Sequence, residues 1–315
     1  MTHFFTKACV TGGAGFIGSH LVRTLLKRGI AVTVLDNLSV GKATNVPTEA
    51  TFVEGDILNP QHLEKAIANC DIVFHLAARV AIRSSFEFAV EDTLTNVVGT
   101  ASLLKTIQRA GSVRKIVAAS SMAVYADSTA FMPIDENHLT APISPYGISK
   151  LAMERLIYTM SANAGIQSAI LRLFNTYGPG QALSPYVGVV TIFINALRSG
   201  ETPTIFGDGE QCRDFVHVED VVSGFVHAMD MPTFNETFNI GTGTPLSVNA
   251  VLRNLNRVMQ TNYTGRHVEA VPGELRYSVA DIRKAQSTLG YEPVHQFHSS
   301  IDEVVREIVR HSTGR

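Results

Sequence analysis

The chain has 315 residues, of which 45% are apolar and 17% are charged, and its formal net charge is -2. This length suits one large α/β domain plus a smaller lobe, each with its own core. A near-neutral charge provides no general basic field, so nothing indicates nucleic acid or a membrane surface as a partner. An anionic ligand would have to be held by a few placed arginines and backbone amides.

The sequence also gives expectations about its compartment. No apolar run reaches the roughly 18 residues of a membrane span, and the first residues lack the basic and apolar regions of a signal peptide. The three cysteines, Cys9, Cys70 and Cys212, form no C-x-x-C pair and no evident framework. We therefore expect a cytoplasmic protein with reduced thiols, and we expect no metal site.

Strand and helix signals alternate through the first half of the chain. Strands are predicted over residues 8–11, 31–36, 51–54, 72–76, 115–120 and 168–173, and helices over 17–28, 60–68, 94–110 and 146–163. Repeated βα units of this length predict a parallel sheet with helices on both faces. Right-handed crossovers favour the doubly wound, Rossmann-type α/β topology.

The pattern loosens after Asn175. Helices are predicted over residues 187–198, 218–228, 248–259 and 300–310, with short strands over 204–209 and 237–240. We expect a dinucleotide-binding domain over residues 1–175 and a smaller mixed α/β lobe over 176–315. Within the second part, residues 216–245 are expected to return to the first domain.

A glycine-rich run, T-G-G-A-G-F-I-G, lies between the first strand and the first helix. Gly12, Gly15 and Gly18 form G-x-x-G-x-x-G, and Phe16 and Ile17 lie inside the run. Such a turn brings bare backbone N–H groups beside a pyrophosphate at a helix N-terminus. A glycine pattern alone is weak evidence, but here it has the strand–turn–helix context that a dinucleotide site requires.

Asp36 ends the second strand, 18 residues after Gly18. A carboxylate there can accept hydrogen bonds from the adenosine ribose and repel a 2′-phosphate, which favours NAD over NADP. The alternative is that Asp36 only opens the turn D-N-L-S. Other cofactor contacts are expected along the carboxyl edge of the sheet, from Asn37, Asp56, Ile57, Leu76, Ala77, Ala78 and Asn96. Asp56 could equally be an exposed turn residue.

Tyr146 and Lys150 stand four residues apart in S-P-Y-G-I-S-K, so they share a helix face. A neighbouring ammonium favours phenolate, which would make a tyrosine with an ordinary pKa of about 10 usable near neutral pH. Ser120 and Ser121 close the fifth strand, where a hydroxyl could share the substrate proton. The alternative for Tyr146 and Lys150 is a helix surface pair. His75 is expected to be a buried strand-end histidine rather than a catalyst.

These motifs, in this order, resemble the extended short-chain dehydrogenase/reductase family, in its nucleotide-sugar epimerase/dehydratase branch. The resemblance spans nearly the whole chain and also includes H-L-A-A, A-S-S-M-A-V-Y, L-R-L-F-N-T-Y-G-P-G and R-D-F-V-H-V-E-D. It implies Tyr146 as acid and base, Lys150 as its partner and ribose anchor, and Ser121 as the hydroxyl relay. Dehydratases of this branch carry an Asp-Glu pair where this chain has Met122 and Ala123, so dehydration is disfavoured.

The resemblance also implies a UDP-sugar site. Asn175 and Arg213 would contact the diphosphate, because a guanidinium meets phosphate oxygens two at a time. By the same resemblance, Arg276 would be a second diphosphate clamp and Glu274 would hold the ribose. Thr204 and Phe206 would lie along uracil, and Arg83 and Ser84 would contact the sugar. Solvated surface charges are the alternative for Arg213 and Arg276, and an ordinary helix-start loop for Arg83 and Ser84.

Ser278 bears on the substrate. Epimerases restricted to plain hexoses hold a bulky tyrosine at the corresponding position, whereas a small side chain leaves room for a 2-acetamido group. The run G-E-L-R-Y-S-V-A-D-I-R-K-A also resembles epimerases that act on UDP-N-acetylglucosamine in polysaccharide pathways. The resemblance therefore implies reversible C4 epimerisation of UDP-N-acetylglucosamine and UDP-N-acetylgalactosamine, with activity on UDP-glucose and UDP-galactose left open.

Two alternatives remain at this stage. One is a different NAD-dependent reaction on a nucleotide sugar, either decarboxylation or net reduction. The other is a non-catalytic NAD-sensing regulator, although such proteins often lose the tyrosine or the lysine. The family also implies a homodimer through the long helices at 94–110 and 146–163, but the sequence does not show that their outer faces are buried.

Overall fold

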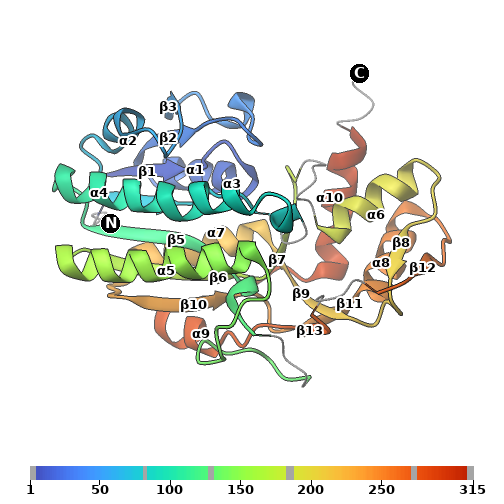
Figure 1. The fold of residues 1–315 in the computed structure, drawn as a ribbon. Coiled ribbons are helices and arrows are strands. Elements are labelled where there is room, and N and C mark those ends of the chain that lie inside the picture. Colours follow the sequence, from blue (N-terminus) through green and yellow to red (C-terminus); the bar gives the residue numbers. More distant parts are fainter. Residues whose placement is uncertain (1–4, 81–83, 127–130, 182–187, 271–274, 311–315) are drawn as a thin grey trace.

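A computed structural model describes residues 5–80, 84–126, 131–181, 188–270 and 275–310 (Figure 1). In this part of the chain, seven strands form one parallel sheet in the order β10-β6-β5-β4-β1-β2-β3. The strands are β1 (Lys7–Thr11), β2 (Ala31–Asp36), β3 (Thr51–Glu54), β4 (Ile72–His75), β5 (Lys115–Ser121), β6 (Gln167–Leu173) and β10 (Glu236–Ile240). The predicted doubly wound fold is confirmed.

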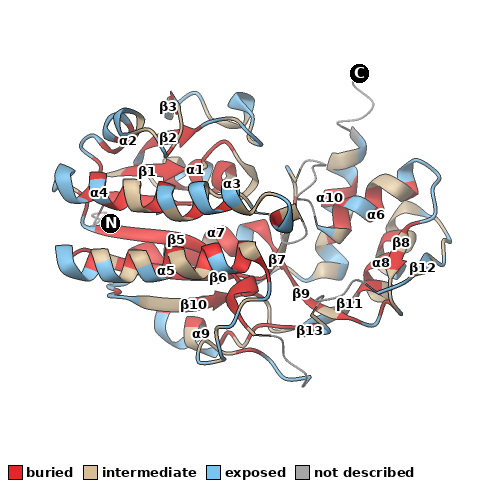
Figure 2. Cartoon of the chain, viewed as in Figure 1, coloured by how far each residue is buried: buried red, intermediate tan, exposed pale blue. Residues whose placement is uncertain are grey.

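Helices cover both faces of the sheet. One face carries α2 (Pro60–Ile67), α4 (Thr100–Ala110) and α5 (Pro145–Ala164), and the other carries α1 (Phe16–Lys27), α7 (Val218–Asp230) and α9 (Arg283–Leu289). Because neighbouring strand residues point to opposite faces, Cys9 and Val73 pack under the first layer, and Val10 and Phe74 under the second. Figure 2 shows the buried strands between helices whose outer sides are exposed.

The long helix predicted over residues 94–110 starts earlier than the sequence indicated. It is a continuous run of α3 (Ala89–Thr93), a π-helical segment η3 (Leu94–Gly99) and α4. Segments of this kind are uncommon and are often found near functional sites. Here the segment lies next to the cleft described below, because Leu94 and Thr95 contribute to its lining.

The second lobe lies beyond the carboxyl edge of the sheet, on the right in Figure 1. It contains α6 (Val189–Arg198), α8 (Val248–Met259), α10 (Phe297–Arg310), β7 (Asn175–Tyr177), β8 (Thr204–Phe206), β9 (Cys212–His217), β11 (Pro245–Ser247), β12 (Arg266–Val268) and β13 (Tyr277–Ser278). Its core includes Phe193, Ile194, Leu252 and Val304. Between β9 and β11 the chain crosses back to the large sheet, where β10 pairs with β6.

Three short 3-10 helices complete the described elements: η1 (Ala43–Asn45), η2 (Ser84–Phe86) and η4 (Met122–Val124). Among the described residues, no helix combines the length and the apolar character needed to cross a bilayer.

Candidate active site

A cleft of about 1790 Å³ separates the carboxyl edge of the sheet from the second lobe. Residues from four strand ends line one side, including Gly12, Asp36, Leu76 and Ser121. Side chains of the second lobe such as Arg213 line the other. This position, at the carboxyl ends of β1 and β4 where the strand order reverses, is where doubly wound proteins bind their ligands.

The glycine turn forms the floor of the cleft. Gly12 has a φ of +73°, and a β-carbon there would lie 2.7 Å from the Ala77 nitrogen. A β-carbon on Gly18 would lie 2.1 Å from the Gly12 oxygen, so α1 can approach β1 closely only with glycine. The N-cap of α1 is Gly15, and no side chain caps this end. Its first-turn amides can therefore bind a pyrophosphate.

Asp36 is held at the end of β2 by two backbone amides. Its carboxylate accepts hydrogen bonds from the nitrogen of Ala14 at 3.0 Å and that of Leu38 at 2.9 Å. Burial raises the pKa of Asp36, and these hydrogen bonds oppose that effect. Each carboxylate oxygen keeps a lone pair for a further donor such as a ribose hydroxyl. The uncapped helix and this fixed carboxylate both fit a dinucleotide.

The remaining residues expected to bind the cofactor divide into two groups. Most line the cleft, namely Phe16, Ile17, Asn37, Asp56, Ile57, Ala77 and Ala78. Asn96 is outside the lining and 1% exposed. Its Oδ1 atom accepts from the Arg79 nitrogen, and its Nδ2 atom donates to the Arg79 carbonyl oxygen and, at 2.9 Å, to the Ser149 hydroxyl. Asn96 thus fastens the segment after β4 to α5.

Tyr146 lies in the first turn of α5. The helix starts there because the Ser144 hydroxyl caps it, accepting from the Gly147 nitrogen at 3.1 Å, and Pro145 occupies the next position. Tyr146 and Lys150 line the cleft together with Ser121, whose hydroxyl is near enough to the Tyr146 phenol to influence its pKa. The three residues predicted to be catalytic are therefore brought together.

Burial dominates the electrostatics at Tyr146 and Lys150. Burial raises the pKa of Tyr146 to about 12, although the hydrogen bond with Ser121 opposes the rise. Burial lowers the pKa of Lys150 to about 8. The ammonium donates to the Ala119 carbonyl oxygen at 2.7 Å. Desolvation of the phenolate sets the direction of the shift in the Tyr146 pKa, and the effect of Lys150 on the phenol stays a prediction for the protein with its cofactor bound.

His75 is a fully satisfied core histidine, as expected. Its ring nitrogens lie 2.8 Å from the Thr11 hydroxyl and 2.9 Å from the Thr100 hydroxyl. Burial lowers its pKa to about 3, so the ring is neutral at physiological pH.

The opposite wall of the cleft carries residues expected to bind the nucleotide. Asn175, Thr204, Phe206 and Arg213 all line it. Arg213 is only 7% exposed, and its guanidinium donates to the Cys212 carbonyl oxygen at 2.9 Å. The buried Oδ1 atom of Asn175 has no hydrogen-bond partner among the described residues, so it can accept one from a ligand.

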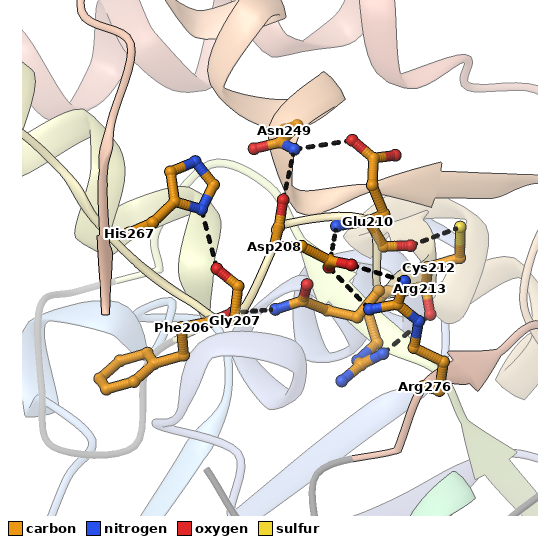
Figure 3. A network of polar contacts seen from close by, with 10 residues as sticks. Phe206, Gly207, Asp208, Glu210, Cys212, Arg213, Asn249, His267 and Arg276 are labelled. Atoms are coloured by element: carbon orange, nitrogen blue, oxygen red, sulfur yellow. Dashed lines mark hydrogen bonds and ion pairs between the residues drawn. The ribbon is translucent and has the colours of Figure 1, made fainter. Parts of the chain in front are cut away.

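Arg276 lies outside the lining of the cleft. Its guanidinium binds the Asp208 carboxylate through two contacts of 2.7 Å and 2.8 Å, and both side chains are about half exposed (Figure 3). Figure 3 also shows Arg213 beside this pair. The structure therefore places only one of the two expected diphosphate clamps in the cleft.

Two further predicted contacts are not brought to the cleft lining. Ser84 starts η2 outside the lining, and Ser278 is 0% exposed within β13, paired in register with Arg213 of β9. Arg83 and Glu274 lie outside the described residues.

Several lining residues were not identified from the sequence. Gln181, Thr191 and Asn195 contribute polar groups from the segment after β7 and from α6, and Gln211 does so from the segment directly before β9. Gln211 donates to the Phe206 carbonyl oxygen at 2.9 Å, and its buried Oε1 atom has no partner in the described part of the chain. Its position two residues before Arg213 was the available hint, because alternate residues of a strand share a face.

Comparisons with known proteins agree with this geometry. The UDP-glucose 4-epimerase of Mycolicibacterium smegmatis is 36% identical over 295 residues, covering 91% of this chain and 93% of that relative. The structure of Thermotoga maritima UDP-glucose 4-epimerase with UDP-glucose has a TM-score of 0.93 at 35% identity, covering 98% of this chain and 100% of the other.

A second similar structure is a UDP-N-acetylglucosamine 4-epimerase from Methanobrevibacter ruminantium in complex with UDP-N-acetylmuramic acid. Its TM-score is 0.91 at 30% identity, covering 97% of this chain and 99% of the other. Decarboxylases of UDP sugars are also among the related proteins. The model of the NAD dependent epimerase/dehydratase family matches residues 8–241, and the chain belongs to this family.

Proposed function

We propose that the protein is a UDP-sugar 4-epimerase that interconverts UDP-N-acetylglucosamine and UDP-N-acetylgalactosamine. The observation that carries the proposal is the meeting of the Tyr146 phenol and the Ser121 hydroxyl in the cleft, one helical turn from Lys150. Such a pair can move one proton to and from a sugar hydroxyl.

The residues that follow Ser121 favour epimerisation over dehydration. Met122 and Ala123 line the cleft next to it, and neither has a group that can transfer a proton. Eliminating water from a sugar needs a separate acid and base beside the reacting carbons. Met122 and Ala123 add no such group to Tyr146 and Ser121, so chemistry at a single hydroxyl is the reaction that these side chains support.

In this proposal Tyr146 takes the proton of the 4-hydroxyl, with Ser121 as the relay between the two oxygens. NAD, when bound, supplies the two-electron oxidation of that alcohol and its reversal. The Lys150 ammonium stabilises the phenolate, and exclusion of water by the bound ligands strengthens this effect. Arg213 and Asn175 hold the diphosphate while the 4-keto sugar turns over. Tyr146 then returns the proton to the oxygen on the inverted carbon.

One observation of the structure supports an acetylated sugar. Ser278 does not line the cleft itself, but it is small and lies in register with Arg213, which does, so its size bears on the wall that faces the sugar nucleotide. Over nearly its whole length the chain is similar both to a UDP-N-acetylglucosamine 4-epimerase and to UDP-glucose 4-epimerases, so the comparisons favour neither sugar. We propose that plain UDP-hexoses are poorer substrates.

The test is incubation of the purified protein with UDP-glucose, UDP-galactose and their two N-acetylated counterparts, followed by chromatographic separation of the products. We expect both N-acetylated sugars to reach the same equilibrium mixture without added oxidant or reductant. Turnover of UDP-glucose alone would overturn the substrate assignment. Release of carbon dioxide from a UDP-uronic acid, or consumption of added NADH, would indicate decarboxylation or reduction instead.

We also propose that the protein is a homodimer. Val90, Leu94 and Val98 recur every fourth residue along α3 and η3, and they are 69%, 44% and 44% exposed. Ile148 on α5 is 56% exposed. An exposed apolar row of this kind favours contact with a second protein surface, and the same row on a second copy of the chain would cover it.

A further inference from the structure

Helix α5 presents one row of side chains to the sheet. Tyr146, Lys150, Glu154 and Tyr158 are spaced by four residues, so they lie on the same face of the helix, which packs beside β5 and β6 (Figure 1). The first two residues belong to the proposed reaction. Glu154, the third residue of the row, is 1% exposed and has no assigned role in that reaction. A carboxylate buried this deeply needs a reason, because burying a charge is costly.

Glu154 joins α5 to two neighbouring strands. Its Oε1 atom accepts from the Ser120 hydroxyl at 2.5 Å and from Nε of Arg172 at 3.0 Å. Its Oε2 atom accepts from Nη2 of Arg172 at 2.7 Å. Ser120 and Arg172 are themselves partners in register on β5 and β6. The carboxylate is thus satisfied at both oxygens, and its charge is neutralised by an arginine that is also buried.

The arginine is held from its other side. The Arg172 guanidinium lies 4.7 Å from the centre of the Tyr125 ring, and the Tyr125 hydroxyl donates to Oδ1 of Asn239 at 2.6 Å. Asn239 belongs to β10, the outer strand of the sheet. The Glu154–Arg172 pair is therefore part of a buried polar chain that extends from α5 to β10, and such fully satisfied networks are rigid.

Three consecutive residues of β5 contact this row of α5. Ala119 accepts from the Lys150 ammonium, Ser120 donates to Glu154, and Ser121 lies beside Tyr146 in the cleft lining. A slip of β5 along α5 would break all three contacts together. The Ser120–Glu154 contact has no role in proton transfer, yet it fixes the backbone immediately before Ser121.

We propose that Glu154 is a positioning residue which, with Arg172, fixes the carboxyl end of β5 against α5 and so holds Ser121 and Lys150 at the Tyr146 phenol. This inference rests on the proposed 4-epimerase function, because it concerns the alignment of the residues that carry that reaction. Displacing a reacting group by about 1 Å can lower a rate by roughly 100-fold.

Glu154 also acts on Lys150 through its charge. Burial lowers the pKa of Lys150 to about 8, and the Glu154 carboxylate opposes this. Among the described residues, the other charged or titratable groups around the two are Tyr146, Arg172, Tyr125, Tyr158 and His75, and His75 is neutral at physiological pH. Removing the carboxylate should therefore lower the pKa of Lys150 further, so the ammonium would be lost at a lower pH.

The test compares Glu154→Gln and Ser120→Ala with a matched control, Tyr158→Phe. The control removes a hydrogen bond from the same face of α5 to Thr237 on β10, but leaves Glu154 and its partners intact. We expect both test variants to lower kcat by about 10-fold or more, with KM for the UDP-sugar changed by less than about threefold. Glu154→Gln should also move the alkaline limb of the kcat profile down by about one pH unit. Tyr158→Phe should change neither.

A second measurement does not depend on turnover. Titration of tyrosinate absorbance, taken as the difference between each protein and its Tyr146→Phe derivative, reports ionisation of the Tyr146 phenol. A displaced Ser121 would no longer lower the phenol pKa, so the phenol should ionise at higher pH in Glu154→Gln than in the parent and in Tyr158→Phe. The inference is overturned if Ser120→Ala and Glu154→Gln, both folded by circular dichroism, keep the kcat and the phenol titration of Tyr158→Phe.

Failure of the proposed function is distinguishable from failure of this inference. In the first case the unmodified protein epimerises none of the UDP-sugars. In the second case the unmodified protein epimerises a UDP-sugar, and Glu154→Gln and Ser120→Ala have the same kcat and phenol titration as Tyr158→Phe. If Glu154→Gln does not fold, Ser120→Ala decides the outcome, because it leaves the Glu154–Arg172 ion pair in place.

Discussion

Arg276 and Asp208, 68 residues apart in the chain, are joined by two charge-assisted hydrogen bonds of 2.7 Å and 2.8 Å. The pair connects the turn after β8 to β13, next to the nucleotide wall of the cleft (Figure 3). The Arg276 guanidinium can therefore bind the diphosphate of a UDP-sugar only if its ion pair with Asp208 opens. Exposed ion pairs are weak enough for such an exchange.

We predict opposite effects from the two sides of this pair. Arg276→Ala should raise KM for the UDP-sugar with little change in kcat, because a phosphate contact is lost. Asp208→Asn should lower KM by less than about fivefold, because the guanidinium is released. Steady-state kinetics at low salt would measure both. A higher KM in Asp208→Asn would instead mean that the intact pair serves binding.

The catalytic hydroxyls should be dispensable for binding and necessary for turnover. We expect Ser121→Ala combined with Tyr146→Phe to lower kcat by about 1000-fold or more, because one position loses the base and the other its relay. Isothermal titration calorimetry with the UDP-sugar should give a Kd close to that of the unmodified protein. Near-normal turnover in the double variant would show that another group moves the proton.

We expect the buried Lys150 side chain to lower the free energy of unfolding, although the proposed reaction needs it. The unfolded chain keeps the lysine proton up to a pKa of 10.5, whereas burial lowers the folded-state pKa to about 8. Folding therefore releases a proton between these values, and the contribution of Lys150 to stability rises with pH across this window. At pH 7 the full cost is present.

Lys150→Met should accordingly be inactive but more stable at pH 7, by on the order of 2 kcal/mol in the free energy of unfolding. The gain should shrink as the pH is raised from about 8 to 10.5. Urea denaturation at several pH values would measure it. A gain that is independent of pH would show that the ammonium is not the source of the cost.

Ser278 should control the size of the acceptable sugar. We predict that Ser278→Tyr lowers turnover of the N-acetylated substrates by about 10-fold or more relative to the plain hexoses, because a large side chain beside Arg213 narrows the cleft. Ser278→Ala is the control and should keep the original preference. Since the position is fully buried, circular dichroism must first show that the tyrosine variant is folded. An unchanged preference in the folded variant would remove Ser278 from the specificity argument.

The exposed apolar row on α3 and η3 should govern association. Val98→Asp places a charge in the row, and it should convert a dimer to monomer in sedimentation velocity experiments. Phe234→Asp alters a side chain that is 63% exposed in the turn before β10, and it should leave the dimer intact. A monomeric unmodified protein would contradict the proposed assembly directly.

The parts of the fold and site that were predictable share a physical basis. The strands of the large sheet are buried on both faces, so they appear in the sequence as short apolar runs that end at Asp36, His75 and Ser121. The convergence of Tyr146, Lys150 and the serine end of β5 on one cleft followed from helical spacing and from the carboxyl edge of a parallel sheet, whereas the choice of Ser121 over Ser120 came from the family resemblance. These are local rules, and they need no knowledge of distant contacts.

The parts that were missed depend on long-range partners. Strands β11 and β13 contain three and two residues, too few for any periodicity to be visible. The attachment of Arg276 to Asp208 and of Glu154 to Arg172 is decided by tertiary packing, and the sequence alone gives no sign of either. The raised pKa of Tyr146 likewise depends on how completely the folded protein buries the phenol.

The crossing of the chain back to β10 has a consequence for biosynthesis. A ribosome releases the outer strand of the large sheet only after α6, β8 and β9 have been made, so the nascent first half leaves the free edge of β6 unpaired until then. Such an edge is a site for mispairing with other chains. We expect truncation before residue 236 to yield an aggregation-prone fragment, even though every residue predicted to transfer a proton is already present.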